Sequence, residues 1–131
     1  MNIVIDTSAI IAVIANEPEK QKLIDLTRGA HLFAPESIKW EVGNAFSLML
    51  KRKRVTLEQA MRALNIFESI SLMWIEIDLN QALKIAYKLG IYAYDAYVIC
   101  GALSNAYPLL SLDKGLLRNA QKLNVKIVEV K

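Results

Sequence analysis

The chain has 131 residues, of which 54% are hydrophobic and 22% are charged, and its formal net charge is +3. This length and composition predict one packed domain, residues 1–131, and exclude a disordered chain. Its longest apolar runs, at 9–15 and 98–103, are far shorter than the roughly 20 residues of a membrane-spanning helix. The basic balance permits a polyanionic partner such as nucleic acid. Since a strand already begins at Asn2, without a charged leader before it, we expect a cytoplasmic protein.

Strands and helices are predicted to alternate along the chain. Short apolar runs bounded by turn residues predict strands at 3–5, 31–34, 72–77, 109–111 and 125–130. Apolar residues at spacings of three and four predict helices at 7–15, 18–29, 36–52, 56–70, 79–89, 94–106 and 114–123. Thr56 with Gln59, and Asp78 with Gln81, have the pattern of a capping box, and Gly90 is a C-terminal stop. This alternation is typical of an α/β fold with a parallel sheet and helices on both faces.

The segment 2–14 reads NIVIDTSAIIAVI, and it carries the first chemical signal. It predicts a buried strand that turns directly into a helix, with Asp6 at the turn. In open parallel sheets, ligands bind in the crevice at the carboxyl ends of the strands. We therefore expect Asp6 to lie in that crevice.

Three further acids are predicted to reach the same crevice. Asp113 follows the strand at 109–111, Asp95 opens the helix at 94–106, and Glu41 lies one to two turns into the helix at 36–52. Four carboxylates held close together repel and raise one another's pKa unless a cation neutralises them. Oxygen ligands without His or Cys select Mg²⁺ or Mn²⁺, and such ions usually act on phosphates.

The reaction that this pattern indicates is phosphodiester hydrolysis. A bound divalent ion lowers the pKa of a water molecule and takes up charge on a phosphoryl oxygen. The sequence offers no Ser–His or Cys–His nucleophile in its place. The alternative for each Asp is a capping role at a helix start, and Glu41 alone could be a solvated helix residue.

Four segments resemble the sequence blocks of PIN-domain ribonucleases: IVIDTSAII, WEVGNAF, YDAYVICGAL and LLSLDKGLL. Their order and the chain length resemble the VapC toxins of prokaryotic toxin–antitoxin pairs. The resemblance implies a PIN-like three-layer sandwich, in which a central, mostly parallel sheet is flanked by helices. It also implies an Mg²⁺- or Mn²⁺-dependent endoribonuclease that forms a homodimer and is silenced by an antitoxin protein whose tail occupies the catalytic groove.

The resemblance assigns the site residues by position. The four catalytic and metal-binding acids are, in order, Asp6, Glu41, Asp95 and Asp113. Ser8 matches a small hydroxyl near the metal, and Ser111 matches a hydroxyl two residues before the fourth acid. Asn44, which shares a helix face with Glu41, could hold that carboxylate in place.

Some family members carry a further acid directly after the third one, where this chain has Ala96 and Tyr97. We therefore expect one tightly held cation, with a second arriving together with the RNA.

Several other residues could bind a partner protein or RNA at the surface. An apolar partner surface could come from Trp40, Phe46 and Met49, or from Leu57, Met61 and Leu64, although core packing is the favoured role for most of these residues. Tyr92, Tyr94 and Tyr97 could stack on bases or simply pack a helix. The basic run 51–54 could line an RNA path or end a solvated helix.

Two other functions compete with nuclease activity. Asp6 could form an aspartyl phosphate in a phosphotransfer domain, but Thr7 and Ser8 stand where those families carry further acids. A PIN-fold binding module without catalytic activity is the second alternative, and the presence of all four acids argues against it.

Overall fold

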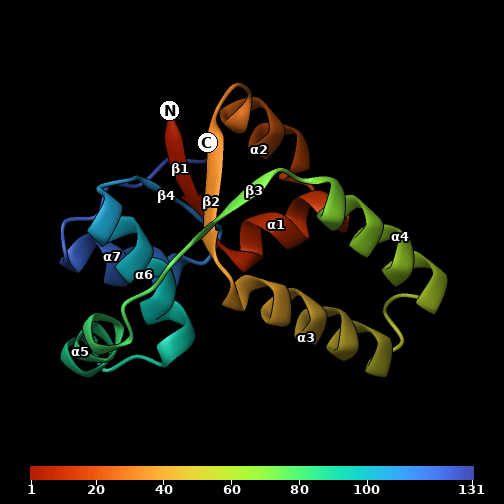
Figure 1. Cartoon of the computed structure of the whole chain (residues 1–131). Coiled ribbons are helices and arrows are strands. Elements are labelled where there is room, and N and C mark those ends of the chain that lie inside the picture. The colour runs from red at the N-terminus through yellow and green to blue at the C-terminus, as the bar shows by residue number, and fades with distance from the viewer.

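The computed structural model describes all residues, 1–131. Its strands are β1 (Asn2–Ile5), β2 (His31–Pro35), β3 (Leu72–Ile75) and β4 (Leu109–Leu110). Its helices are α1 (Thr7–Ile14), α2 (Lys20–Thr27), α3 (Ser37–Lys51), α4 (Leu57–Ser69), α5 (Leu79–Leu89), α6 (Ala93–Asn105) and α7 (Lys114–Lys122). The four strands form one sheet in which every neighbouring pair is parallel (Figure 1).

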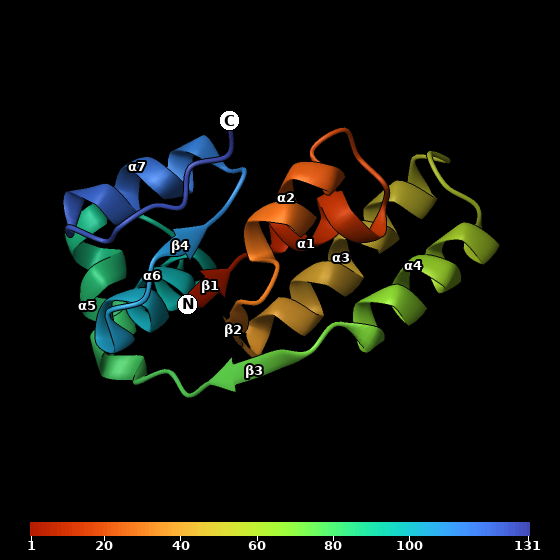
Figure 2. The same ribbon diagram turned by 90° about the horizontal axis from the view of Figure 1, so that it is seen from above.

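The helices cover both faces of the sheet, so the molecule has three layers (Figure 2). One layer holds α1 to α4, with α1 packed on α2, α3 and α4. The other layer holds α5, α6 and α7, and α6 contacts both β1 and β2. The predicted α/β fold, a three-layer sandwich with a parallel central sheet flanked by helices, is confirmed. No helix has both the length and the apolar character needed to cross a membrane.

The strand order β3-β2-β1-β4 determines where a ligand can bind. The chain builds the sheet outward from β1 to β3 and then returns to add β4 on the other side of β1. At this reversal, the connections after β1 and β4 leave toward different layers and open a crevice at the carboxyl ends of the strands. Asp6, directly after β1, lies at this point of the fold.

The central strand β1 is buried on both faces. Ile3 and Val4 are fully buried, and Val4 is paired with Phe33 of β2 and with Leu109 of β4. A strand with apolar side chains on both faces requires helices above and below it, which explains its uninterrupted apolar sequence. The core around β1 therefore fixes the backbone that leads to Asp6.

Local capping signals were mostly correct. Thr56 and Gln59 form the complete capping box of α4, and Gly90 ends α5 in the left-handed conformation, with φ of 66°. At α5, only half of the predicted box forms: Asp78 accepts from the Gln81 amide, without the reciprocal bond.

The predicted last strand at 125–130 is wrong. Only Ile127 forms a bridge, to Leu109, supported by hydrogen bonds from Leu109 N to Lys126 O and from Val128 N to Leu109 O. The segment would have to pair with β4, which is only two residues long and therefore offers a single pairing position. Likewise, β3 ends at Ile75, two residues earlier than predicted.

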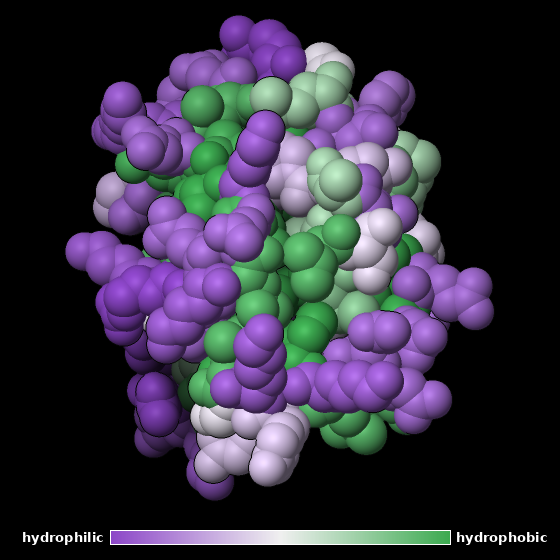
Figure 3. Space-filling model, turned by 90° about the vertical axis from the view of Figure 1, so that its left-hand side faces the viewer, coloured by the Kyte–Doolittle hydropathy of each residue, from purple (hydrophilic) through white to green (hydrophobic).

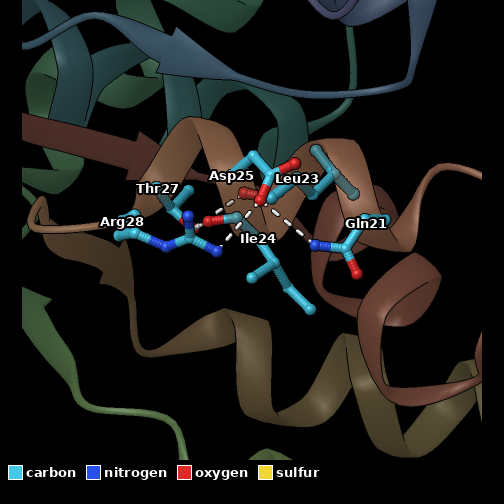
Figure 4. Close-up of polar contacts among 6 residues, drawn as sticks. All are labelled: Gln21, Leu23, Ile24, Asp25, Thr27 and Arg28. Atoms are coloured by element: carbon cyan, nitrogen blue, oxygen red, sulfur yellow. Dashed lines mark hydrogen bonds and ion pairs between the residues drawn. The ribbon is translucent and has the colours of Figure 1, made fainter.

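The α2 helix has no side chain capping its N-terminus and instead carries a small polar network (Figure 4). Asp25 accepts from Gln21 at 3.1 Å and pairs with Arg28 at 3.0 Å, and the Thr27 hydroxyl bonds the Leu23 carbonyl. These exposed contacts contribute roughly 1 kcal/mol or less. Asp25 is thus an acid with a purely local, solvated role.

Candidate functional site

Asp6 is a buried carboxylate held by three donors. It caps α1 by accepting the Ala9 amide at 3.1 Å, and it accepts the hydroxyls of Ser8 at 2.8 Å and Ser111 at 2.7 Å. Only 5% of Asp6 is exposed. Burial raises its pKa, the three donors counteract that rise, and the negative charge of Asp113 adds to it.

The Ser8 and Ser111 hydroxyls also tie the β4 loop to the start of α1. Ser111 Oγ accepts the Asp113 amide at 2.9 Å, and Ser8 Oγ accepts the Leu112 amide at 2.9 Å. Each hydroxyl donates to Asp6 while accepting from the loop. The pairing of β1 with β4 brings these residues together although they are more than 100 positions apart in the chain.

Glu41 reaches the same place from α3, one turn after the helix begins at Ser37. Its pKa is raised to about 7: burial is the largest cause, the charges of Asp6 and Asp95 add to the rise, and the nearby hydroxyls of Thr7 and Ser37 oppose it. Neither hydroxyl forms a hydrogen bond, however: Thr7 Oγ1, Ser37 Oγ and Glu41 Oε2 are all buried without a partner. Two unpartnered hydroxyls beside an unpartnered carboxylate oxygen are free to bind an added ligand.

The remaining two acids come from the other helical layer. Asp95 lies in the first turn of α6, and burial, together with the charge of Asp113, raises its pKa. Asp113 is exposed and caps α7, accepting the Leu116 amide at 3.1 Å. The capping role considered for Asp6 and Asp113 is therefore real, and it coexists with their position at the crevice.

All four predicted acids line one pocket of about 500 Å³, which we call the acid pocket. Two of them follow the strands β1 and β4, and the other two lie in the helices α3 and α6. Two further acids, Glu17 and Glu19 from the α1–α2 connection, line its rim. No Lys or Arg is in the lining to balance them. No three acidic side chains are arranged closely enough to enclose a metal ion, so a cation would have to draw them together.

The donor set nevertheless fits a hard divalent cation. The acid pocket presents carboxylate and hydroxyl oxygens, without His or Cys, which is the chemistry that Mg²⁺ and Mn²⁺ prefer. Burial is the largest cause of the raised pKa values of Asp6, Glu41 and Asp95, and the negative charges of neighbouring acids add to each rise. A cation held by these residues would relieve that repulsion and engage the unpartnered Glu41 Oε2.

A second cavity, of about 610 Å³, adjoins the acid pocket (the side groove). Its lining consists of Thr7, Trp40, Glu41, Asn44, Ala45, Leu48 and Tyr94. Asn44 thus faces the same space as Glu41, whereas the Glu41 oxygen that it was predicted to hold has no partner. The role of Asn44 beside the carboxylate stays a prediction.

Sequence reasoning missed four residues at this site. Glu17 and Glu19 were not predicted to lie at the site. Thr7 is directly next to Asp6, and Ser37 precedes Glu41 by four residues, so helical spacing could have indicated their proximity.

One residue considered for an apolar partner surface lies in the core instead: Phe46 is buried and forms no part of a surface.

Comparisons with known proteins agree with this architecture. The family model described as "PIN domain" matches residues 3–122. PAE2754 from Pyrobaculum aerophilum is 26% identical, with a TM-score of 0.72 over 94% of this chain and 95% of that chain. Two complexes are similar in fold over 98% of both chains: VapBC2 from Rickettsia felis, bound to a promoter DNA fragment (16% identity, TM-score 0.67), and VapBC-1 from nontypeable Haemophilus influenzae (19%, 0.65). A search of curated proteins found no match.

Proposed function

Because this chain belongs to the PIN domain family, we propose that it is a metal-dependent endoribonuclease that hydrolyses RNA phosphodiester bonds. One observation carries the proposal: acids from four separate elements line a single pocket in which their mutual repulsion is uncompensated. Hydrolysis of a phosphodiester is the reaction for which such a carboxylate set is suited when it holds a divalent ion.

In this mechanism, four acids would hold Mg²⁺ or Mn²⁺: Asp6, Glu41, Asp95 and Asp113. When bound, the ion supplies a water molecule of lowered pKa and electrostatic stabilisation of the phosphoryl oxygens. Ser8 and Ser111 hold the Asp6 carboxylate in one orientation, and their bonds to the β4 loop also position Asp113. The chain's single His and single Cys lie elsewhere: His31 is at the opposite end of the sheet, where it pairs with Asn2, and Cys100 is buried.

The test is cleavage of single-stranded RNA by Asp6→Asn protein. The Asn side chain can still cap α1, so we expect a folded variant without detectable cleavage, and EDTA should abolish cleavage by the wild type. Asp25→Asn is the matched control, because Asp25 is an exposed α2 acid and does not line the pocket. Undiminished, EDTA-insensitive cleavage by Asp6→Asn would refute the proposal.

We also propose that one cation binds before the substrate and that a second arrives with the RNA. Ala96 is buried and Tyr97 is not acidic, so α6 supplies only Asp95 to the pocket. Isothermal titration of Mn²⁺ into metal-free protein should give one strong site. Two strong sites in the absence of RNA would contradict this stoichiometry.

The fold likeness to two VapBC complexes supports a further proposal: the chain is the toxin of such a pair and has an antitoxin partner in the cytoplasm, where its RNA substrate lies. Leu57 and Met61, one turn apart on α4, are 63% and 47% exposed and could bind an apolar helix. The product of the neighbouring reading frame should co-purify with the chain and suppress cleavage. Met61→Lys should weaken that association, and a neighbour without either effect would contradict the assignment.

We also propose that the chain forms a homodimer through the side of the molecule opposite α4. Figure 3 shows an apolar band on the face where α5, α6 and α7 lie. Leu79 and Leu83, one turn apart on α5, are 57% and 53% exposed and belong to this side of the chain. We expect a dimer by light scattering, and Leu83→Lys should yield a monomer.

One observation favours the alternative of a PIN-fold binding module without activity, namely that no three acids are yet arranged to enclose a metal ion. Metal-dependent cleavage would exclude it. Phosphotransfer through Asp6 is less well supported, because this carboxylate is buried and engaged by two hydroxyls and an amide.

A further inference from the structure

The side groove has aromatic walls. Trp40 is 73% exposed and Tyr94 is 54% exposed, and both line it. Tyr94 is held edge-on against Tyr97, with ring centroids 5.9 Å apart and an interplanar angle of 83°. Large aromatic side chains are normally buried, so two that remain exposed in one concave surface indicate a ligand with flat, apolar faces.

One wall of the side groove is a stripe along α3. Trp40, Asn44 and Leu48 are spaced by four residues, so they lie one above the other on the same side of the helix. All three are exposed and line the groove. The stripe therefore offers a stacking surface, a hydrogen-bonding amide and an apolar contact in succession.

The side groove opens into the acid pocket. Thr7, Glu41 and Ala45 line both cavities, so the stripe begins where the proposed reaction takes place. A polymer whose phosphodiester is held at the acids must continue in both directions from that bond. Because the side groove is continuous with the acid pocket, it can hold the strand on one side of that bond.

Basic residues follow at the far end of the stripe. Lys51 ends α3, and Arg52 follows Leu48 by four residues, continuing the same helix side. The run 51–54 consists of Lys, Arg, Lys and Arg, all exposed, and none of them forms an ion pair. At 1.5 Å per residue, Glu41 and Arg52 are roughly 16 Å apart along the helix. Four unpaired cations at this distance complement a polyanion rather than an apolar peptide.

We infer that the side groove and the basic run form the path of single-stranded RNA leading from the acid pocket. In this arrangement, unpaired bases stack on Trp40 and Tyr94, the Asn44 amide meets a base edge, and the following phosphates reach the run 51–54. The inference rests on the proposed nuclease function. It adds which side chains bind the bases on one side of the cleaved bond, where Trp40 and Tyr94 are the stacking surfaces.

Tryptophan fluorescence tests this path directly, since the chain has two Trp residues. In a Trp74→Phe, Asp6→Asn protein, Trp40 is the only reporter and binding is measured without cleavage. A short oligouridylate should quench its emission, whereas an abasic oligonucleotide with the same phosphates should not. Trp40→Ala in otherwise wild-type protein should raise KM for RNA about 5- to 150-fold, the loss expected for one stacked base. Its kcat and Mn²⁺ affinity should stay unchanged.

Leu26→Ala, an exposed apolar residue on α2, is the control and should leave KM unchanged. Arg52→Gln with Arg54→Gln should flatten the dependence of RNA affinity on salt. Equal quenching by the abasic strand, an unchanged KM in Trp40→Ala, or tighter binding of an acidic peptide than of RNA would overturn the inference. Failure of the nuclease proposal has a different signature, because wild-type protein would then not cleave RNA in Mn²⁺ at all.

Discussion

Replacing Glu41 by Gln should stabilise the metal-free protein at alkaline pH, although it removes a proposed catalytic acid. Burial, together with the charges of Asp6 and Asp95, raises the pKa of Glu41 to about 7. A carboxyl whose pKa is raised by folding binds its proton more tightly in the folded state. Its contribution to the unfolding free energy is therefore full at acidic pH and is lost as the pH rises through about 7.

The size of this effect follows from the shift. A rise of the Glu41 pKa from its ordinary value to about 7 would destabilise the folded protein with charged Glu41 by about 3 kcal/mol, if the whole shift acted on stability. Glu41 is only partly buried, and solvent screening reduces this to about 1–2 kcal/mol. In EDTA at pH 8, Glu41→Gln should thus raise Tm by about 3–8 °C, and the increase should vanish near pH 5.

Thermal unfolding followed by circular dichroism in EDTA, from pH 5 to pH 8.5, measures this prediction. Glu68→Gln, at an exposed α4 acid, is the control and should change the unfolding free energy by less than about 0.5 kcal/mol. Mn²⁺ should raise the Tm of the wild type at pH 8 and that of Glu41→Gln much less. A wild-type Tm that is flat over this pH range, or a Glu41→Gln protein that is less stable at pH 8, would refute the electrostatic account of the pocket.

Three further substitutions test the structure around the site and away from it. Ser111→Ala removes the 2.7 Å bond to Asp6 and should lower Mn²⁺ affinity roughly 10- to 100-fold in a calorimetric titration, while unchanged affinity would show that this hydroxyl positions nothing. Thr56→Ala breaks the capping box with Gln59 and should cost about 1 kcal/mol in chemical unfolding without altering cleavage. Ala106→Gly should raise the free energy of unfolding by about 0.5–1 kcal/mol, because Ala106 ends α6 in the left-handed conformation, which glycine adopts without steric cost. A lower free energy of unfolding for this variant would contradict this reasoning.

The local elements could be predicted because their signals are local. The apolar run before Asp6 predicts a buried strand, and Thr56 with Gln59 predicts where α4 begins, since both depend on neighbours within four residues. The segment 125–130 was misassigned for the same reason. Its apolar sequence is typical of a strand, but pairing depends on the length of β4, which is remote in the chain and offers a single position.

The sequence by itself determined the α/β alternation and the PIN-like block order, and it predicted four acids that line one pocket, because side-chain periodicity and motif spacing depend only on positions along the chain. Only the tertiary structure decided how those acids are supported. The parallel pairing of β1 with β4 brings Ser111 to Asp6, and the packing of α3 buries Glu41 beside Thr7 and Ser37 without hydrogen-bond partners. Burial, repulsion between carboxylates and unpartnered polar atoms are properties of residues brought together across the fold, so no local pattern could have specified them.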